Sequence, residues 1–192
     1  MRLICILVLA LGAQASLADN ANEITQYQVE RLDDEILVSA QIAFELPAAV
    51  EDALVKGIPM FFVMEADVLQ ERWYWYDKKL VSAERHARLA YQPLTRRWRL
   101  NVNTGVGRDS GLGLVLNQGF DTLAQALIAI KRLSRWKIAD ASELDSNQKY
   151  RVNLRFRLDL NQLPRPFQIG ALGQSDWDIE ASSSVTLLPA PK

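Results

Sequence analysis

The residues best suited to binding chemistry are arginines and tryptophans on segments that alternate like β-strands. Arginine holds carboxylate and phosphate groups through two parallel hydrogen bonds, and indole combines a flat apolar face with a hydrogen-bond donor. If these strands adjoin, their side chains form a recognition surface for an acidic partner. The candidate residues are Trp73, Trp75, Arg85, Arg96, Arg97, Trp98, Arg99, Arg151, Arg155 and Arg157.

The same residues also have a purely structural interpretation. Aromatic side chains are favoured in strands, and arginines on a sheet pair with acids on neighbouring strands. The sequence therefore leaves open whether the arginines form a binding surface or an ion-pair lattice. The acids available for such pairs are Glu65, Asp67, Glu71, Glu84 and Asp159.

No residue set predicts catalysis by a nucleophile or a metal. His86, the only histidine, lies among charged residues of a predicted strand, so a dyad with Ser110 has no supporting context. The glycine-rich stretch 105–113 lacks the lysine of a phosphate-binding loop and predicts a hairpin loop. Cys5, the only cysteine, lies in the N-terminal apolar segment, so no zinc–thiolate site is expected. We predict no cofactor.

Two pairs of acids support an alternative. Glu65 and Asp67 share one face of a predicted strand, and Asp176 and Asp178 flank Trp177. Paired acids hydrolyse glycosides when a cleft holds them at a suitable separation, but alternate residues of any strand lie at similar distances. We therefore favour a non-enzymatic binding or accessory module. The alternative, a carboxylate-dependent envelope hydrolase, requires such a pair in a deep pocket.

The first 18 residues have the pattern of a secretory signal peptide. Arg2 precedes an apolar stretch from Leu3 to Leu11, and small residues occupy positions 16 and 18. Cleavage is expected between Ala18 and Asp19, and cleavage after Ala15 is the weaker alternative. The apolar stretch is about half the ~20 residues that a membrane-spanning helix requires. We therefore predict an exported, periplasmic protein with no transmembrane anchor after cleavage.

The composition is that of an ordinary globular protein. The chain has 192 residues, of which 49% are hydrophobic and 23% charged, and its formal net charge is -1. A nucleic-acid binder needs a net basic footprint, so that function is not expected. The length favours one β-rich domain over residues 19–188, followed by a disordered tail at 189–192.

Strand patterns dominate the predicted domain. In residues 150–160, apolar side chains at 150, 152, 154, 156 and 158 alternate with polar ones, so we expect one buried face. The corresponding apolar residues of 36–46 are expected nearby or on a facing layer. Two short helices are expected, at 47–56 and at 120–134, where Lys131, Arg132, Arg135 and Lys137 complement the C-terminal end. The order of elements predicts an α+β fold with a mostly antiparallel sheet or sandwich. The remaining strands are predicted at 24–31, 58–76, 81–91, 97–103 and 177–187.

Several short sequence segments together resemble one family of exported bacterial proteins, known as domain of unknown function 4390. They are Asp52–Leu54, Lys56–Pro59, Arg72–Trp75, Tyr91–Arg99, Leu158–Leu160 and Leu163–Ile169. The resemblance implies export in a Gram-negative bacterium, and it brings no assigned activity and no catalytic residues. It also implies a partner, because the family is often encoded beside a membrane sensor kinase. The expected partners are the extracytoplasmic part of such a kinase or an anionic envelope component.

Overall fold

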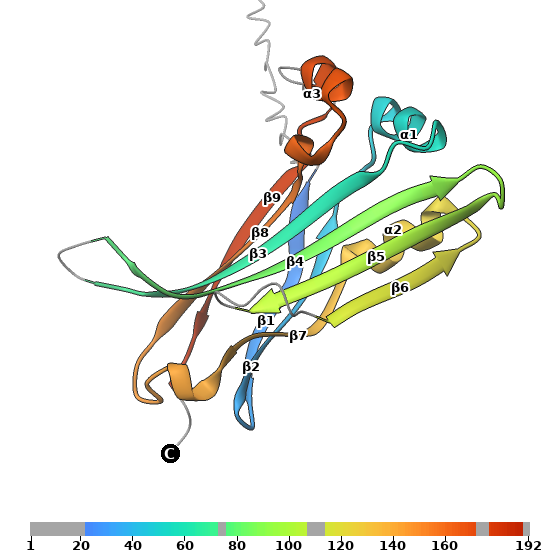
Figure 1. Ribbon diagram of the computed structural model, residues 1–192. Helices are drawn as coiled ribbons and strands as arrows, with labels where there is room; N and C mark the ends of the chain where they lie inside the picture. The colour runs from blue at the N-terminus through green and yellow to red at the C-terminus, as the bar shows by residue number, and fades with distance from the viewer. Residues whose placement is uncertain (1–21, 73–75, 107–113, 172–176, 190–192) are drawn as a thin grey trace, which may run out of the picture.

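Two antiparallel sheets enclose one hydrophobic core in the computed structural model, which describes residues 22–72, 76–106, 114–171 and 177–189 (Figure 1). The smaller sheet has the strand order β1-β2-β7, and the larger has the order β6-β5-β4-β3-β8-β9. The predicted α+β, mostly antiparallel fold is confirmed. The strands are β1 (Glu23–Leu32), β2 (Glu35–Ala43), β3 (Met60–Gln70), β4 (Lys78–Gln92), β5 (Arg97–Val106), β6 (Leu114–Phe120), β7 (Arg132–Asp140), β8 (Tyr150–Leu158) and β9 (Glu180–Leu187).

Three helices accompany the sheets. α1 (Ala48–Val55) follows β2, α2 (Leu123–Lys131) packs against β5 and β6, and α3 (Arg165–Ala171) follows β8. α1 ends as the sequence predicts. Gly57 adopts the left-handed φ of 87°, and its amide donates to the carbonyl oxygen of Leu54 at 2.8 Å.

The core lies between the facing sheets. Phe44, Phe62 and Phe156 meet at its centre, with ring centroids 5.0 to 5.8 Å apart. Every second residue of β8, from Tyr150 to Leu158, is buried, as the alternation predicts. The facing layer includes the apolar residues of β2. The arginines of β8 therefore lie on the outer face of the larger sheet.

The prediction of one helix over residues 120–134 is wrong. The helix begins after Thr122, whose hydroxyl accepts from the Gln125 amide at 3.3 Å, and it ends at Lys131. The chain then turns into β7, where Leu133 and Trp136 are buried opposite β2. Burying these side chains requires the extended backbone that begins at Arg132. The basic residues from Arg132 onwards therefore belong to a strand.

The two sheets meet along one side, where β1 lies beside β9. The Tyr27 hydroxyl on β1 donates to the carbonyl oxygen of Val152 on β8 at 3.0 Å. Burial raises the pKa of Tyr27, so its hydroxyl remains protonated and keeps this hydrogen bond across the physiological range. This contact joins the N-terminal strand to the larger sheet.

Candidate recognition surface

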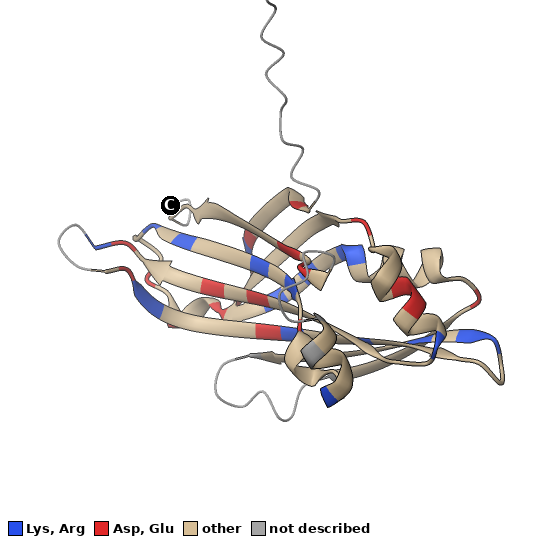
Figure 2. Ribbon diagram, turned by 90° about the horizontal axis from the view of Figure 1, so that it is seen from above, with Lys and Arg blue, Asp and Glu red and all other residues tan. Residues whose placement is uncertain are grey.

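The outer face of the larger sheet is mostly polar, although Phe61 and Val63 of β3 share it. The strand register places charged and amide side chains of neighbouring strands side by side, as at Glu65 between Arg155 and Glu84. Figure 2 shows acidic and basic residues as bands on neighbouring strands. Of the predicted surface residues, Arg97, Arg99, Arg151, Arg155 and Arg157 share this face. Their surroundings differ between β8 and β5.

The arginines of β8 are paired with acids. Arg151 contacts Asp77 at 3.0 Å and also Glu71, which lies beyond the end of β3. Arg155 lies 3.7 Å from Glu180 on β9, and Arg157 lies 3.4 Å from Asp159. At β8 the structural interpretation of the arginines, a lattice of ion pairs, therefore describes the geometry.

The acid pair of β3 lies on the same open face. Lys79 contacts Asp67 at 2.6 Å and Glu65 at 3.6 Å, and the Ser82 hydroxyl donates to Asp67 at 2.7 Å. The hydrogen bond with Asp67 raises the pKa of Lys79. The two acids, with Arg151 and Arg155, line a shallow groove of about 430 Å³. Its acidic and basic side chains compensate one another.

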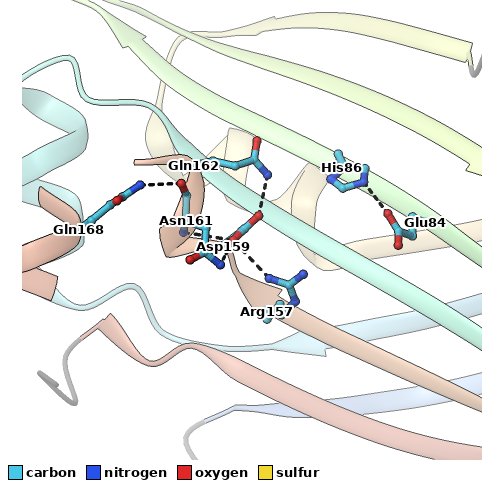
Figure 3. A network of polar contacts seen from close by, with 7 residues as sticks. All are labelled: Glu84, His86, Arg157, Asp159, Asn161, Gln162 and Gln168. Atoms are coloured by element: carbon cyan, nitrogen blue, oxygen red, sulfur yellow. Dashed lines mark hydrogen bonds and ion pairs between the residues drawn. The ribbon is translucent and has the colours of Figure 1, made fainter. Parts of the chain in front are cut away.

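Asp159 is the centre of a polar network at the end of β8 (Figure 3). It is 8% exposed and accepts from the Gln162 side chain at 2.7 Å, and from the Asn161 backbone and side chain at 3.2 Å. Burial alone raises its pKa. The hydrogen bonds from Gln162 and Asn161 and the charge of Arg157 outweigh that effect, so the pKa of Asp159 lies below its ordinary value.

This network is structural. The Gln168 side chain donates to the carbonyl oxygens of Asn161 at 2.6 Å and Leu163 at 2.8 Å, which joins α3 to the turn after β8. The nearby His86 contacts Glu84 of its own strand at 3.0 Å. Ser110, the other member of the candidate dyad, lies outside the described residues.

A second groove, of about 490 Å³, crosses β5 and β6 on the outer face. We call it the β5–β6 groove. Arg97 and Arg99 line it together with Gln92, Thr95 and the amides of Asn101 and Asn117, which hydrogen-bond to each other across the two strands. None of its described lining residues is acidic. The groove is therefore positively charged, although Arg97 also contacts Asp121 at 3.1 Å.

The turn beside this groove adds an apolar side chain. Leu94 is fully exposed in the turn that joins β4 to β5, next to the groove residues Gln92 and Thr95. Exposed leucine beside arginine is a combination that suits binding of an amphipathic segment.

Several predicted surface residues lie elsewhere. Trp98 is 7% exposed and packs on Tyr91 at 4.8 Å between ring centroids, so its prediction as a surface residue is wrong. Arg85 lies opposite Met64 on the inner face, where burial lowers its pKa. Arg96 lies in the β4–β5 turn with a φ of 51°. Trp73 and Trp75 lie outside the described residues.

A third groove, of about 480 Å³, lies on the outer face of the smaller sheet, and none of the predicted site residues lines it. Arg132, Ser134 and Arg135 of β7 line it with Ser39 of β2, whose hydroxyl accepts from the Arg135 amide at 3.0 Å. These residues were missed because their segment was assigned to a helix. The alternation of Arg132, Leu133 and Ser134 is the signal that predicts a strand.

Within residues 22–72, 76–106, 114–171 and 177–189, no three His, Cys, Asp or Glu side chains come together in a way that would hold a metal ion. No helix in the same part of the chain has the length and apolarity needed to cross a membrane.

A family model described as "Domain of unknown function (DUF4390)" matches residues 19–186. No curated protein and no solved structure matches the chain.

Proposed function

The chain belongs to the DUF4390 family, and from that premise we propose that it is a non-enzymatic periplasmic binding module that recognises an acidic partner. The observation that carries the proposal is the β5–β6 groove. Two arginines project from the same face of one strand, beside amide and hydroxyl groups, and no described acid lines the groove. Such a set binds carboxylate or phosphate groups through charge-assisted hydrogen bonds.

The groove over β8, on the same face, is less suited to an acidic partner, which favours the β5–β6 groove as the binding site. Over β8, the positive charges of Arg151 and Arg155 lie among acids, and Lys79 binds Glu65 and Asp67. An acidic ligand there competes with acids already in place. Among the described residues, Asp121 is the acid that competes in the β5–β6 groove; it is not a lining residue, and it contacts Arg97. Arg99 is therefore the principal contact of the proposed site.

The hydrolase alternative has less support. Glu65 and Asp67 face an open sheet surface and share an ion pair with Lys79. A general acid acts from a protonated carboxyl group in a cleft, whereas these two carboxylates contact the Lys79 ammonium on an open face. The geometry therefore supports binding rather than glycoside hydrolysis.

The partner that we propose is the extracytoplasmic part of a membrane sensor kinase, as the family resemblance implies. Crosslinking in cells, followed by capture of the protein and mass spectrometry, tests this assignment. We expect the kinase to be captured with the native chain, and Arg99→Ala to lower its yield at least about fivefold, since hydrogen bonds to charged groups contribute about 1.5–3 kcal/mol.

Two matched controls accompany that experiment. Arg132→Ala removes an arginine from the groove of the smaller sheet, and Arg155→Ala removes one from the ion-pair lattice. Both variants should keep the partner. Equal recovery of the kinase with folded Arg99→Ala contradicts the proposal. Loss of binding to anionic vesicles in Arg99→Ala, with no kinase captured, would instead identify an anionic envelope component.

Export is the second testable part of the proposed function. The family match begins at residue 19, directly after the predicted cleavage point. We expect the mature protein to begin at or near Asp19 and to appear in the periplasmic fraction. N-terminal sequencing of the fractionated protein measures this. An intact segment from Met1 to Ala18 on cytoplasmic protein would contradict export.

A further inference from the structure

Among the described strands, β6 is an edge of the larger sheet, with no strand paired on its outer side (Figure 1). An open edge presents unpaired backbone amides and carbonyls, and proteins usually protect it with charged residues, proline, a bulge or a covering segment. The other edge strand of this sheet, β9, lies beside β1. In the smaller sheet, β7 carries Arg132, Arg135 and Lys137, and both of its edge strands have irregular pairing with β2.

In the described structure, β6 lacks three of these protections: charged residues, proline and a bulge. Its sequence, Leu114–Phe120, contains no charged residue and no proline, and its pairing with β5 continues without a register shift. Val115 is 56% exposed and Leu116 is 43% exposed. A regular, uncharged edge with exposed apolar side chains is the kind of edge that accepts another strand.

One glycine connects this edge to the proposed groove. Gly119 of β6 lies directly opposite Arg99 of β5, and a Cβ atom at Gly119 would meet nothing within 4 Å. A strand added to β6 would lie about 10 Å from β5, two strand spacings away. Because Gly119 has no side chain, β6 places no side chain directly opposite Arg99 on the outer face, between β5 and such a strand.

We infer that β6 binds an extended acidic segment of the partner as an additional antiparallel or parallel strand. An acidic side chain beside Gly119 pairs with Arg99 on the outer face, and an apolar side chain on the opposite face contacts Leu116. This inference rests on the proposed function, since it assigns the acidic partner a mode of binding. Backbone hydrogen bonds supply the affinity, and the position of the acid supplies the register.

Charge complementarity selects this occupant over a second copy of the chain. Leu114–Phe120 contains no acidic residue. Pairing of β6 with another β6 would therefore bring no carboxylate from that strand to Arg99. An acidic extended segment can both pair with the backbone of β6 and bring a carboxylate to Arg99.

Synthetic peptides test the inference on the full mature protein. The probe is a heptapeptide that alternates valine and glutamate, and its counterpart has lysine in place of glutamate. Hydrogen exchange measures protection of the β6 amides, and fluorescence anisotropy of labelled peptide measures affinity. We expect the acidic peptide to protect β6 and to bind about tenfold less tightly to Arg99→Ala, the change expected when one charge-assisted hydrogen bond is lost.

Leu116→Lys tests the edge itself, because a charge pointing inward at an edge strand opposes strand addition. We expect it to weaken binding of the acidic peptide at least about tenfold. Leu188→Lys, the same change at an exposed residue after β9, should bind like the native chain. Circular dichroism establishes that both variants are folded.

The outcomes separate this inference from the proposed function. If the acidic peptide needs Arg99 for binding but does not protect the β6 amides, strand addition is wrong, whereas acidic recognition by the β5–β6 groove still holds. If both peptides protect the β6 amides equally, β6 accepts an added strand, but recognition of acidic side chains is wrong. A dimer that Leu116→Lys dissociates, seen by sedimentation, identifies a second copy as occupant and overturns the acidic segment. Absence of β6 protection at millimolar peptide also overturns the inference.

Discussion

Replacing Phe156 by alanine will lower the free energy of unfolding by about 3–5 kcal/mol, the range observed for phenylalanine truncations in packed cores. Phe156 is fully buried, with ring centroids 5.0 Å from Phe44 and 5.8 Å from Phe62. Phe44 continues the chain beyond β2, whereas Phe62 and Phe156 lie on adjacent strands of the larger sheet. The truncation therefore leaves a cavity at the contact between the layers. Urea denaturation followed by tryptophan fluorescence measures the change.

Phe61→Ala is the matched control. Phe61 lies on the outer face of β3, where its half-buried ring packs under the Arg88 guanidinium at 5.9 Å. Its truncation should cost about 1 kcal/mol, since less apolar surface is buried and a partly exposed cation–π contact is weak. Similar losses at the two positions would contradict the assignment of the core to the space between the sheets.

The second large effect concerns Asp159. Asp159→Asn should destabilise the protein by about 1–3 kcal/mol at neutral pH, because donors arranged around a carboxylate lose a charged acceptor. The pKa of Asp159 is lowered in the folded protein. Its contribution to stability is therefore fully present above the ordinary aspartate pKa and is lost as the pH falls through the lower, folded value.

The pH dependence gives this prediction its specific test. Chemical denaturation from neutral pH down to about pH 2 should show the native protein and Asp159→Asn converging below the ordinary aspartate pKa of about 3.9. Asp33→Asn, at the exposed turn between β1 and β2, should change stability by about 0.5 kcal/mol or less at neutral pH. If the difference in unfolding free energy between the native protein and Asp159→Asn stays constant down to the lowest pH, the charge of Asp159 contributes nothing to stability.

Alternating segments were predictable because one face of each strand is buried. The apolar set of β8 and the β1–β2 hairpin follow directly from the period of two. The same rule explains the position of Arg85. It continues the phase of Val81, Ala83, Ala87 and Leu89, so the alternation of β4 itself directs Arg85 inward. Grouping Arg85 with the surface arginines overlooked that phase.

The missed elements depended on tertiary contacts. In residues 123–138, helical and strand periods follow one another without a glycine or proline between them, so the local pattern does not show where the helix ends. Pairing with β2 decides the boundary. β6 was missed because its exposed residues carry no alternation of polar and apolar faces. Its existence depends on pairing with β5.

The candidate site was also predictable only in the part that depends on local sequence pattern. Arg97 and Arg99 were predicted as surface residues together with Trp98, because arginines cluster on segments that alternate like strands. It did not indicate that the arginines of β8 would find acids while those of β5 would line a groove without acids. That difference depends on the strand order and register, which the sequence of a single strand does not contain.

The contact between Tyr27 and Val152 also has a consequence for how the chain reaches its fold. These residues lie 125 positions apart, and the central strand β3 finds a partner in β8 only after most of the chain has been made. Contacts between such distant segments require closure of long loops before they contribute stability, and folds dominated by them form slowly. The larger sheet therefore cannot be completed until β8 has emerged from a ribosome or a narrow channel, and an unfolded chain is the form that a narrow channel can pass.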